Sequence, residues 1–187
     1  MVLYINSCVR EDSRTDKIAR AVLGKIGNDY KELYLPEENL QPLSRERLER
    51  RTMLIESGDY SDEIFSYAKQ FASADKIVIS APFWDLSFPS LLKLYIENIY
   101  VTGIVSEYTA DGRPRGLCKA KELIYVTTAG GPYVPDYSYG YIKDLCENYL
   151  GISEVNLIYA EMLDVDGFDE ERIVSKVIDD INEGNIV

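Results

Sequence analysis

The sequence predicts one α/β domain whose five-stranded parallel sheet, of strand order 2-1-3-4-5, lies between two layers of helices. Two observations predict this architecture. Short apolar runs alternate along the chain with amphipathic helical segments, as expected when helices connect parallel strands. The length of 187 residues suits one domain with a single core, so we expect residues 1–187 to form it.

Five segments are predicted to be strands. The clearest is 76–80, because β-branched residues dominate it, as they do in a central strand buried on both faces. The others share an apolar core bounded by turn residues. They are the run that begins at Leu3 and the segments 30–35, 121–128 and 155–160.

Six segments are predicted to be helices. In 15–26 the apolar residues recur on one helical face, and the helix is expected to end at Gly27 and Asn28. The helix 90–100 is apolar around much of its circumference, so other elements must cover it widely. The remaining four are 44–57, 59–74, 137–150 and 169–182, and 109–116 is expected to be a turn-rich loop.

The chain is acidic overall, with a formal net charge of −12. Nucleic acids and anionic membranes are bound by clustered Lys and Arg, so this charge argues against both as partners. No apolar run reaches the length of a membrane span, and the N-terminus leads directly into a strand, so we expect no signal peptide and a cytoplasmic protein. The local exception is a basic cluster of Arg10, Arg14, Lys17 and Arg20.

Residue types that are absent or dispersed narrow the chemistry further. The chain contains no His, which excludes Ser-His and Cys-His catalytic groups and His-ligated metal sites. Cys8, Cys118 and Cys146 are far apart and have neither metal-ligand nor redox-pair spacing. We expect these thiols to be reduced and mostly buried.

The loop after the first strand is predicted to bind a phosphate group. A strand, a polar loop and the start of a helix follow one another, which leaves the first N–H groups of the helix free to bind an anion. Ser7, Ser13 and Thr15 offer hydroxyl donors. Arg10 and Arg14 add guanidinium groups that can bind phosphate oxygens. The alternative is that Ser13 or Thr15 only caps the helix and the arginines are solvated.

Two further loops follow the third and fourth predicted strands. The first, 81–89, combines two prolines with large apolar side chains that could form a ligand wall, a plug at the edge of the core or a subunit contact. The second, 127–133, contains Gly130 and Gly131, whose backbone can approach a ligand closely or form a simple tight turn. In a sheet of the predicted order, strands 1, 3 and 4 are neighbours, so all three loops converge on one crevice. A phosphate loop, an aromatic wall and a glycine floor together indicate a ring-bearing phosphorylated cofactor.

The three loops, 7–15, 81–86 and 127–131, resemble those of the flavodoxin-like NAD(P)H:quinone oxidoreductase and FMN-dependent NADH-azoreductase family, and the resemblance covers nearly the whole chain. It implies a flavodoxin-like fold with FMN bound non-covalently at a homodimer interface. It also implies NAD(P)H as co-substrate, and a ping-pong reaction in which a hydride passes through flavin N5 to a quinone, an azo compound or a similar small acceptor. Because the flavin carries this chemistry, no catalytic side chain is assigned.

The resemblance also assigns residues to the cofactor site. The flavin phosphate would be held by Ser7, Ser13, Arg14 and Thr15, to which charge adds Arg10. The residues that would lie along the edge of the isoalloxazine ring are Pro82, Phe83, Trp84, Asp85 and Leu86. Its pyrimidine side would be contacted by Thr128, Ala129, Gly130 and Gly131. Tyr133 could line the substrate pocket or donate a proton.

Two positions depart from the pattern of this family. Members commonly have Asn where Asp85 stands. A carboxylate can accept a hydrogen bond from flavin N3–H but cannot donate one, and its charge would disfavour a reduced anionic flavin. Ala129 is smaller than the Arg that some azoreductases carry, which leaves the substrate side more open.

Two other functions fit parts of the sequence. Cys8 and Arg14, separated by five residues and followed by Thr15, match the signature of low-molecular-weight cysteine phosphatases. The negative charges of Glu11 and Asp12 within that loop, and the lack of an Asp-Pro pair to supply the general acid, argue against this function. The other alternative is a flavodoxin-like electron carrier, whose acidic surface would steer basic redox partners.

Overall fold

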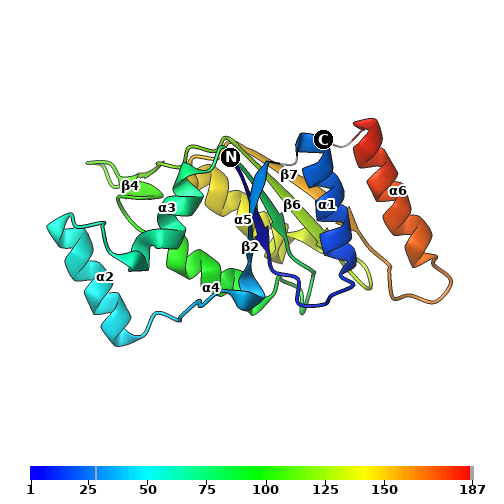
Figure 1. Ribbon diagram of the computed structural model, residues 1–187, viewed down its shortest axis with the longest axis horizontal. Helices are drawn as coiled ribbons and strands as arrows, with labels where there is room; N and C mark the ends of the chain where they lie inside the picture. The colour runs from blue at the N-terminus through cyan, green and yellow to red at the C-terminus, as the bar shows by residue number, and fades with distance from the viewer. Residues whose placement is uncertain (28, 186–187) are drawn as a thin grey trace.

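The protein is built on a five-stranded parallel sheet (Figure 1). The computed structural model describes residues 1–27 and 29–185. The strands lie in the order β2-β1-β3-β6-β7, and each neighbouring pair is parallel. Their bounds are Val2–Asn6 for β1, Tyr30–Tyr34 for β2, Lys76–Ser80 for β3, Glu122–Thr128 for β6 and Glu154–Ala160 for β7. The prediction of a parallel α/β sheet is confirmed.

A small antiparallel hairpin accounts for the labels 2-1-3-6-7 in place of the expected 2-1-3-4-5. Its strands are β4 (Ser106–Tyr108) and β5 (Pro114–Gly116), so the segment expected to be a loop contains the turn and the second strand. Gly116 in this hairpin packs closely against the backbone of Leu150 and Gly151. A Cβ atom on Gly116 would lie 2.0 Å from the backbone nitrogen of Gly151, so only glycine fits.

Helices cover both faces of the sheet (Figure 1). On one face, α1 (Arg14–Ile26) and α6 (Glu170–Glu183) pack on the strands through apolar side chains such as Ile18, Val22 and Ile181. On the other face lie α3 (Ser66–Ser73), α4 (Ser90–Ile99) and α5 (Tyr139–Leu145). The α4 helix buries Leu92, Tyr95 and Ile96, among others, as its apolar circumference predicts.

The remaining segments differ from the predictions mainly in their bounds. The helix expected over 59–74 is a 3₁₀ turn, Glu63–Phe65, followed by α3, because the Asp62 side chain accepts a hydrogen bond from the Ile64 N–H and sets the start at that point. The helix expected over 137–150 is a 3₁₀ turn (Pro135–Tyr137), then α5, then one π turn, Cys146–Leu150. Gly27 ends α1 as expected, whereas Asn28 lies outside the described residues.

The α2 helix (Arg45–Ser57) was predicted from its composition and has an unusual position. A short 3₁₀ turn, Leu35–Glu37, and an extended connection lead to it from β2, and none of its residues is fully buried. Figure 1 shows it standing at one end of the molecule. The three cysteines are free and buried, as expected. None of the helices in the described part of the chain is both long and apolar enough to cross a membrane.

The close approach at Gly116 generates a stability prediction. Gly116→Ala is expected to lower the free energy of unfolding by about 2 kcal/mol or more, because the new methyl group would overlap backbone atoms that cannot move aside easily. The matched variant is Gly24→Ala in α1, where a Cβ atom would meet nothing within 4 Å and the free energy of unfolding should rise by about 0.5–1 kcal/mol. Urea denaturation of both variants tests this, and equal effects would contradict the packing described.

Candidate functional site

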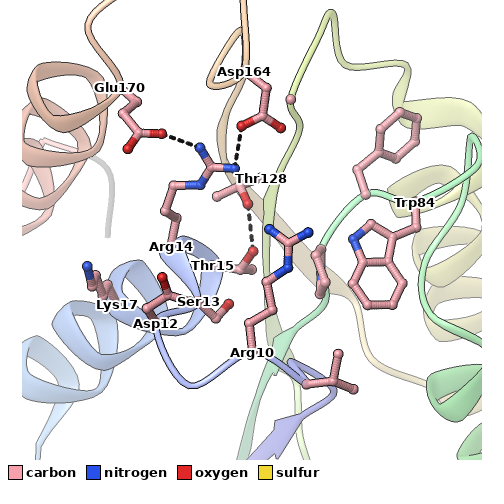
Figure 2. Close-up of a pocket in the computed structure, with 14 residues that line it drawn as sticks. Arg10, Asp12, Ser13, Arg14, Thr15, Lys17, Trp84, Thr128, Asp164 and Glu170 are labelled. Atoms are coloured by element: carbon pink, nitrogen blue, oxygen red, sulfur yellow. Dashed lines mark hydrogen bonds and ion pairs between the residues drawn. The ribbon is translucent and has the colours of Figure 1, made fainter.

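A pocket of about 390 Å³ lies where the loops that follow β1, β3 and β6 meet (Figure 2). A fourth segment, between β7 and α6, closes one side of it. The predicted site residues on its wall are Arg10, Ser13, Arg14, Thr15, Pro82, Phe83, Trp84, Thr128 and Gly130. The other predicted residues, Ser7, Asp85, Leu86, Ala129, Gly131 and Tyr133, lie behind or beside this wall.

The first turn of α1 faces the pocket with unused donors. Ser13 is the N-cap, and its hydroxyl accepts a hydrogen bond from the Asp16 N–H at 3.3 Å, so the capping role considered as the alternative is real. Among residues 1–27 and 29–185, no acceptor is bound to the N–H groups of Arg14 and Thr15. The Thr15 hydroxyl bonds to the Thr128 hydroxyl at 2.7 Å, which joins the loops after β1 and β6. The helix start can therefore bind an anion through its backbone.

The two arginines of the loop have different surroundings. The Arg14 guanidinium donates to Asp164 Oδ1 at 2.8 Å, to Glu170 Oε2 at 2.5 Å and to the Leu163 carbonyl at 3.1 Å. Arg10 has no carboxylate within ion-pair distance in the described ranges, and Figure 2 shows its side chain extending into the pocket. Of the two, Arg10 is the cation available to a ligand, while the assignment of Arg14 to a phosphate group stays a prediction.

Ser7 links two strands of the sheet and does not line the pocket. It is fully buried, and its hydroxyl and its N–H both donate to the Ser80 carbonyl, at 2.8 and 3.0 Å. These bonds fix the end of β1 to the end of β3. Its predicted contact with a phosphate would require this hydroxyl to leave Ser80.

The glycine loop after β6 is held by the segment after β7. The N–H groups of Met162, Leu163 and Asp164 donate to the carbonyls of Gly131, Ala129 and Gly130, respectively. A Cβ atom on Gly130 would lie 2.3 Å from Asp164 Oδ2, so a larger residue there would displace the Asp164 carboxylate. Asp164 and Glu170 were not predicted as site residues. The signal that could have found them is their place after the fifth strand, at the same edge of the sheet.

The loop after β3 contains a tight hairpin turn at its tip. The N–H and carbonyl groups of Trp84 and Ser87 are paired at 2.9 and 2.8 Å. The two central residues are left-handed, with φ of 50° at Asp85 and 64° at Leu86. These are the requirements of a type I′ turn, in which Asp is tolerated but Leu is strained. Leu86 is also 56% exposed, so its side chain does little to offset this strain within the monomer.

Tyr133 supports the aromatic wall from behind. Its ring packs edge-on against Phe83, with 5.0 Å between centroids, and tilts against Tyr159 at 5.3 Å. Its hydroxyl bonds to the buried Ser138 at 3.0 Å, and burial raises its pKa. The hydroxyl is therefore engaged inside the protein, and Tyr133 contacts the pocket through the Phe83 ring that it supports, so its two predicted roles stay predictions.

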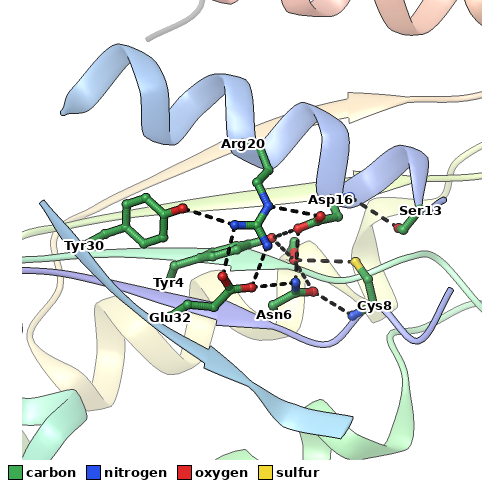
Figure 3. Close-up of polar contacts among 9 residues, drawn as sticks. Tyr4, Asn6, Cys8, Ser13, Asp16, Arg20, Tyr30 and Glu32 are labelled. Carbon is green, nitrogen blue, oxygen red and sulfur yellow. Dashed lines mark hydrogen bonds and ion pairs between the residues drawn. The ribbon is translucent and has the colours of Figure 1, made fainter. Parts of the chain in front are cut away.

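A polar network lies beside the pocket, between β1, β2 and α1 (Figure 3). Arg20 donates to Asp16 Oδ2 at 3.1 Å and to both carboxylate oxygens of Glu32, at 2.7 and 3.0 Å. The Tyr4 hydroxyl donates to Asp16 Oδ1 at 2.5 Å, and the Asn6 amide donates to both carboxylates at 3.1 Å. The network fixes the first turn of α1 to the sheet.

Cys8 belongs to this network and is a poor nucleophile. It is buried, its Sγ contacts Ser80 Oγ at 3.5 Å, and burial raises the pKa of its thiol above the usual range. A phosphatase needs the opposite, an exposed thiolate of lowered pKa. The arginine of the proposed signature, Arg14, points to Asp164 and Glu170. The phosphatase alternative is therefore not supported. In the described part of the chain, no cluster of three or more Cys, Asp or Glu side chains could hold a metal ion.

Comparisons with known proteins agree with this geometry. Residues 1–183 match a family model described as flavodoxin-like fold. An FMN-dependent NADH:quinone oxidoreductase of Clostridium acetobutylicum is 37% identical, over 97% of this chain and 96% of the relative. A protein of the same name from Coprothermobacter proteolyticus is 35% identical, over 93% and 92%.

Solved structures share the fold at lower identity. An azoreductase from Bacillus anthracis superposes with a TM-score of 0.83 at 22% identity, over 98% of this chain and 97% of that one. An FMN-dependent NADH-azoreductase from the same species, solved in complex with FMN, gives a TM-score of 0.79 at 22% identity, over 98% and 96%.

The strained turn predicts a difference between two substitutions at one position. Leu86→Gly should be more stable than Leu86→Ala by about 1 kcal/mol, because only glycine accepts a positive φ without strain, while both variants lose the same exposed side chain. Thermal unfolding of the two variants measures the difference. Equal stability would mean that the turn is not left-handed in solution.

The polar network predicts a pH-dependent contribution to stability. Burial tends to raise the pKa of Glu32, but the hydrogen bonds from Arg20 and Asn6 outweigh it, so this pKa lies below its usual value. A lowered pKa stabilises the folded state above the unfolded pKa of about 4.3, and that contribution is lost as the pH falls through the folded value. The stability lost by Glu32→Gln should be constant near pH 7 and shrink toward pH 3. Urea denaturation at several pH values tests this, with Glu171→Gln on the exposed side of α6 as control.

Proposed function

Because the chain belongs to the flavodoxin-like family of FMN-dependent NADH:quinone oxidoreductases, we propose that it is an enzyme that uses FMN and NADH to reduce quinones, azo compounds or similar small acceptors. The observation that carries this proposal is a pocket in which three features meet: a helix start with unused N–H groups, an Arg10 that forms no ion pair with any described residue, and the aromatic loop after β3. Relatives that align over more than nine-tenths of this chain support it.

The residues of the pocket fit the two ends of FMN. The N–H groups of Arg14 and Thr15, the hydroxyl of Ser13 and the guanidinium of Arg10 would hold the phosphate at the start of α1. Phe83 and Trp84 offer an apolar surface to the ring, and Gly130 keeps the opposite wall free of a side chain. When bound, FMN supplies the hydride transfer between NADH and the acceptor.

The protein side chains hold and orient the cofactor, and no proton transfer is assigned to any of them. Pro82 and Thr128 complete the wall beside the aromatic side chains. Asp85, Ala129 and Gly131 are proposed as further contacts to the ring because each is next in sequence to a residue of the wall. Leu86 is proposed as another because it lies in the same tight turn as Trp84 and Asp85. Ser7 is proposed to act on the phosphate only indirectly, by fixing the loop through Ser80.

The exposed side chains near the pocket suggest a homodimer. Trp84 and Leu86 are 37% and 56% exposed, and large apolar groups beside a ligand site are typical of a surface that a second subunit covers. A second copy of this chain would bury both and relieve the unfavourable exposure of Leu86. The three reduced cysteines fit a cytoplasmic enzyme.

The visible spectrum of the purified protein after addition of FMN and desalting tests the proposal directly. We expect a retained flavin band that bleaches with NADH and returns when a quinone is added. Retained flavin without NADH oxidation would favour the electron carrier instead. Absence of retained flavin would contradict both.

Arg10→Ala is expected to weaken FMN binding about tenfold, because it removes a charge-assisted hydrogen bond to the phosphate. Riboflavin, which lacks the phosphate, should bind this variant and the wild type equally well. Quenching of flavin fluorescence measures both affinities. Arg172→Ala, an exposed position on α6, is the control, and an equal loss in the two variants would contradict the role of Arg10.

A further inference from the structure

The positive and negative formal charges of the pocket wall are equal in number. The lining contains the cations Arg10, Arg14 and Lys17 and the carboxylates Asp12, Asp164 and Glu170, so their formal charges sum to zero. A pocket for a phosphate dianion would be expected to carry excess positive charge. The arrangement of these six groups therefore decides how strongly a phosphate is attracted.

Arg14 is the cation whose charge is already compensated. Both of its terminal nitrogens bond to carboxylates, through Asp164 on one side and Glu170 on the other. The three side chains together carry a formal charge of −1. This Arg14–Asp164–Glu170 triad consequently repels an anion that the sequence predicts Arg14 to attract.

The structure around the triad fixes its two carboxylates. The Asp164 N–H donates to the Gly130 carbonyl at 2.8 Å, which places the carboxylate beside the glycine loop. Glu170 lies in the first turn of α6, where the helix dipole favours a negative charge. Figure 2 shows both carboxylates directed at the Arg14 guanidinium. The pairing therefore needs no rearrangement of either loop.

We propose that Asp164 and Glu170 lower the affinity of this pocket for a phosphate group, by holding Arg14 in ion pairs and by adding negative charge to the wall. The proposal rests on the proposed function for the identity of the ligand as a flavin phosphate. Arg10 and the start of α1 attract the phosphate, and the triad limits how tightly it is held. Glu170 lies on the α6 side of the pocket, whereas Asp164 also borders the glycine loop at Gly130. Riboflavin therefore has to be measured beside FMN, to separate an effect on the phosphate from an effect on the ring.

The test compares ligands with and without a phosphate group. In the full chain freed of flavin, Asp164→Asn with Glu170→Gln changes the formal charge of the triad from −1 to +1 and releases the Arg14 guanidinium. We expect the dissociation constant for FMN to fall about tenfold or more, and that for riboflavin to change less than about twofold. Inorganic phosphate, measured by calorimetry, should also bind the double variant more tightly. Glu171→Gln is the matched control, because it removes one negative charge from the same turn of α6 outside the pocket.

The outcomes separate this inference from the proposed function. Unchanged or weaker FMN binding in a folded double variant would overturn it, as would an equal gain for FMN and riboflavin. If inorganic phosphate binds the double variant more tightly but neither flavin binds any form, the inference stands and the flavin function fails. The single variant Glu170→Gln, whose side chain is 51% exposed, gives a smaller gain in the same direction and serves if the double variant does not fold.

Discussion

The parallel hydrogen-bond ladder does not stop where the strands end, and the site depends on this continuation. Beyond the last paired residues, Ser7 donates to Ser80, Ala81 to Val126, Phe83 to Thr128, and Ala129 to Ala160. Each bond joins the start of one loop to the end of the next strand. Neighbouring loops are therefore held about one strand spacing apart, roughly 4.8 Å, before any side chain contributes. The pocket is the space left at this edge of the sheet.

Charges on either side of the α1 start have different roles. The side facing β2 is closed by Arg20, which is paired with Asp16 and Glu32 and lies over the Tyr4 ring at 5.4 Å. The side facing α6 is closed by Arg14. Of these three arginines, Arg10 lies between the other two and is the one that forms no ion pair with a described residue. An acidic protein thus keeps a localised positive charge by neutralising the arginines around it.

Features encoded by local pattern could be predicted from the sequence, whereas features set by distant pairs could not. The strand 76–80 and helix α1 followed from residue type and periodicity, and the meeting of three loops followed from the sheet order. The three-residue strands of the hairpin are too short to show a pattern. The pairing of Arg14 with Glu170 could not be predicted, because the two residues lie 156 positions apart in the sequence. The hydrogen bond from the Ser7 hydroxyl to the Ser80 carbonyl likewise joins residues that are far apart in the sequence, so only the fold reveals it.

The position of α2 implies that the molecule has parts of unequal stability. Leu54 and Ile55 are only partly buried against the core, and the helix is otherwise held by polar contacts such as that from Arg51 to the Glu97 carbonyl at 3.0 Å. Little apolar surface is exposed when such a helix detaches, so it can open while the sheet remains intact. Its backbone amides would then exchange with solvent through local opening, and those of β1 and β3 only through global unfolding. The sequence of α2 is accordingly less constrained by packing in the core, and its surface can change to suit contacts with other molecules.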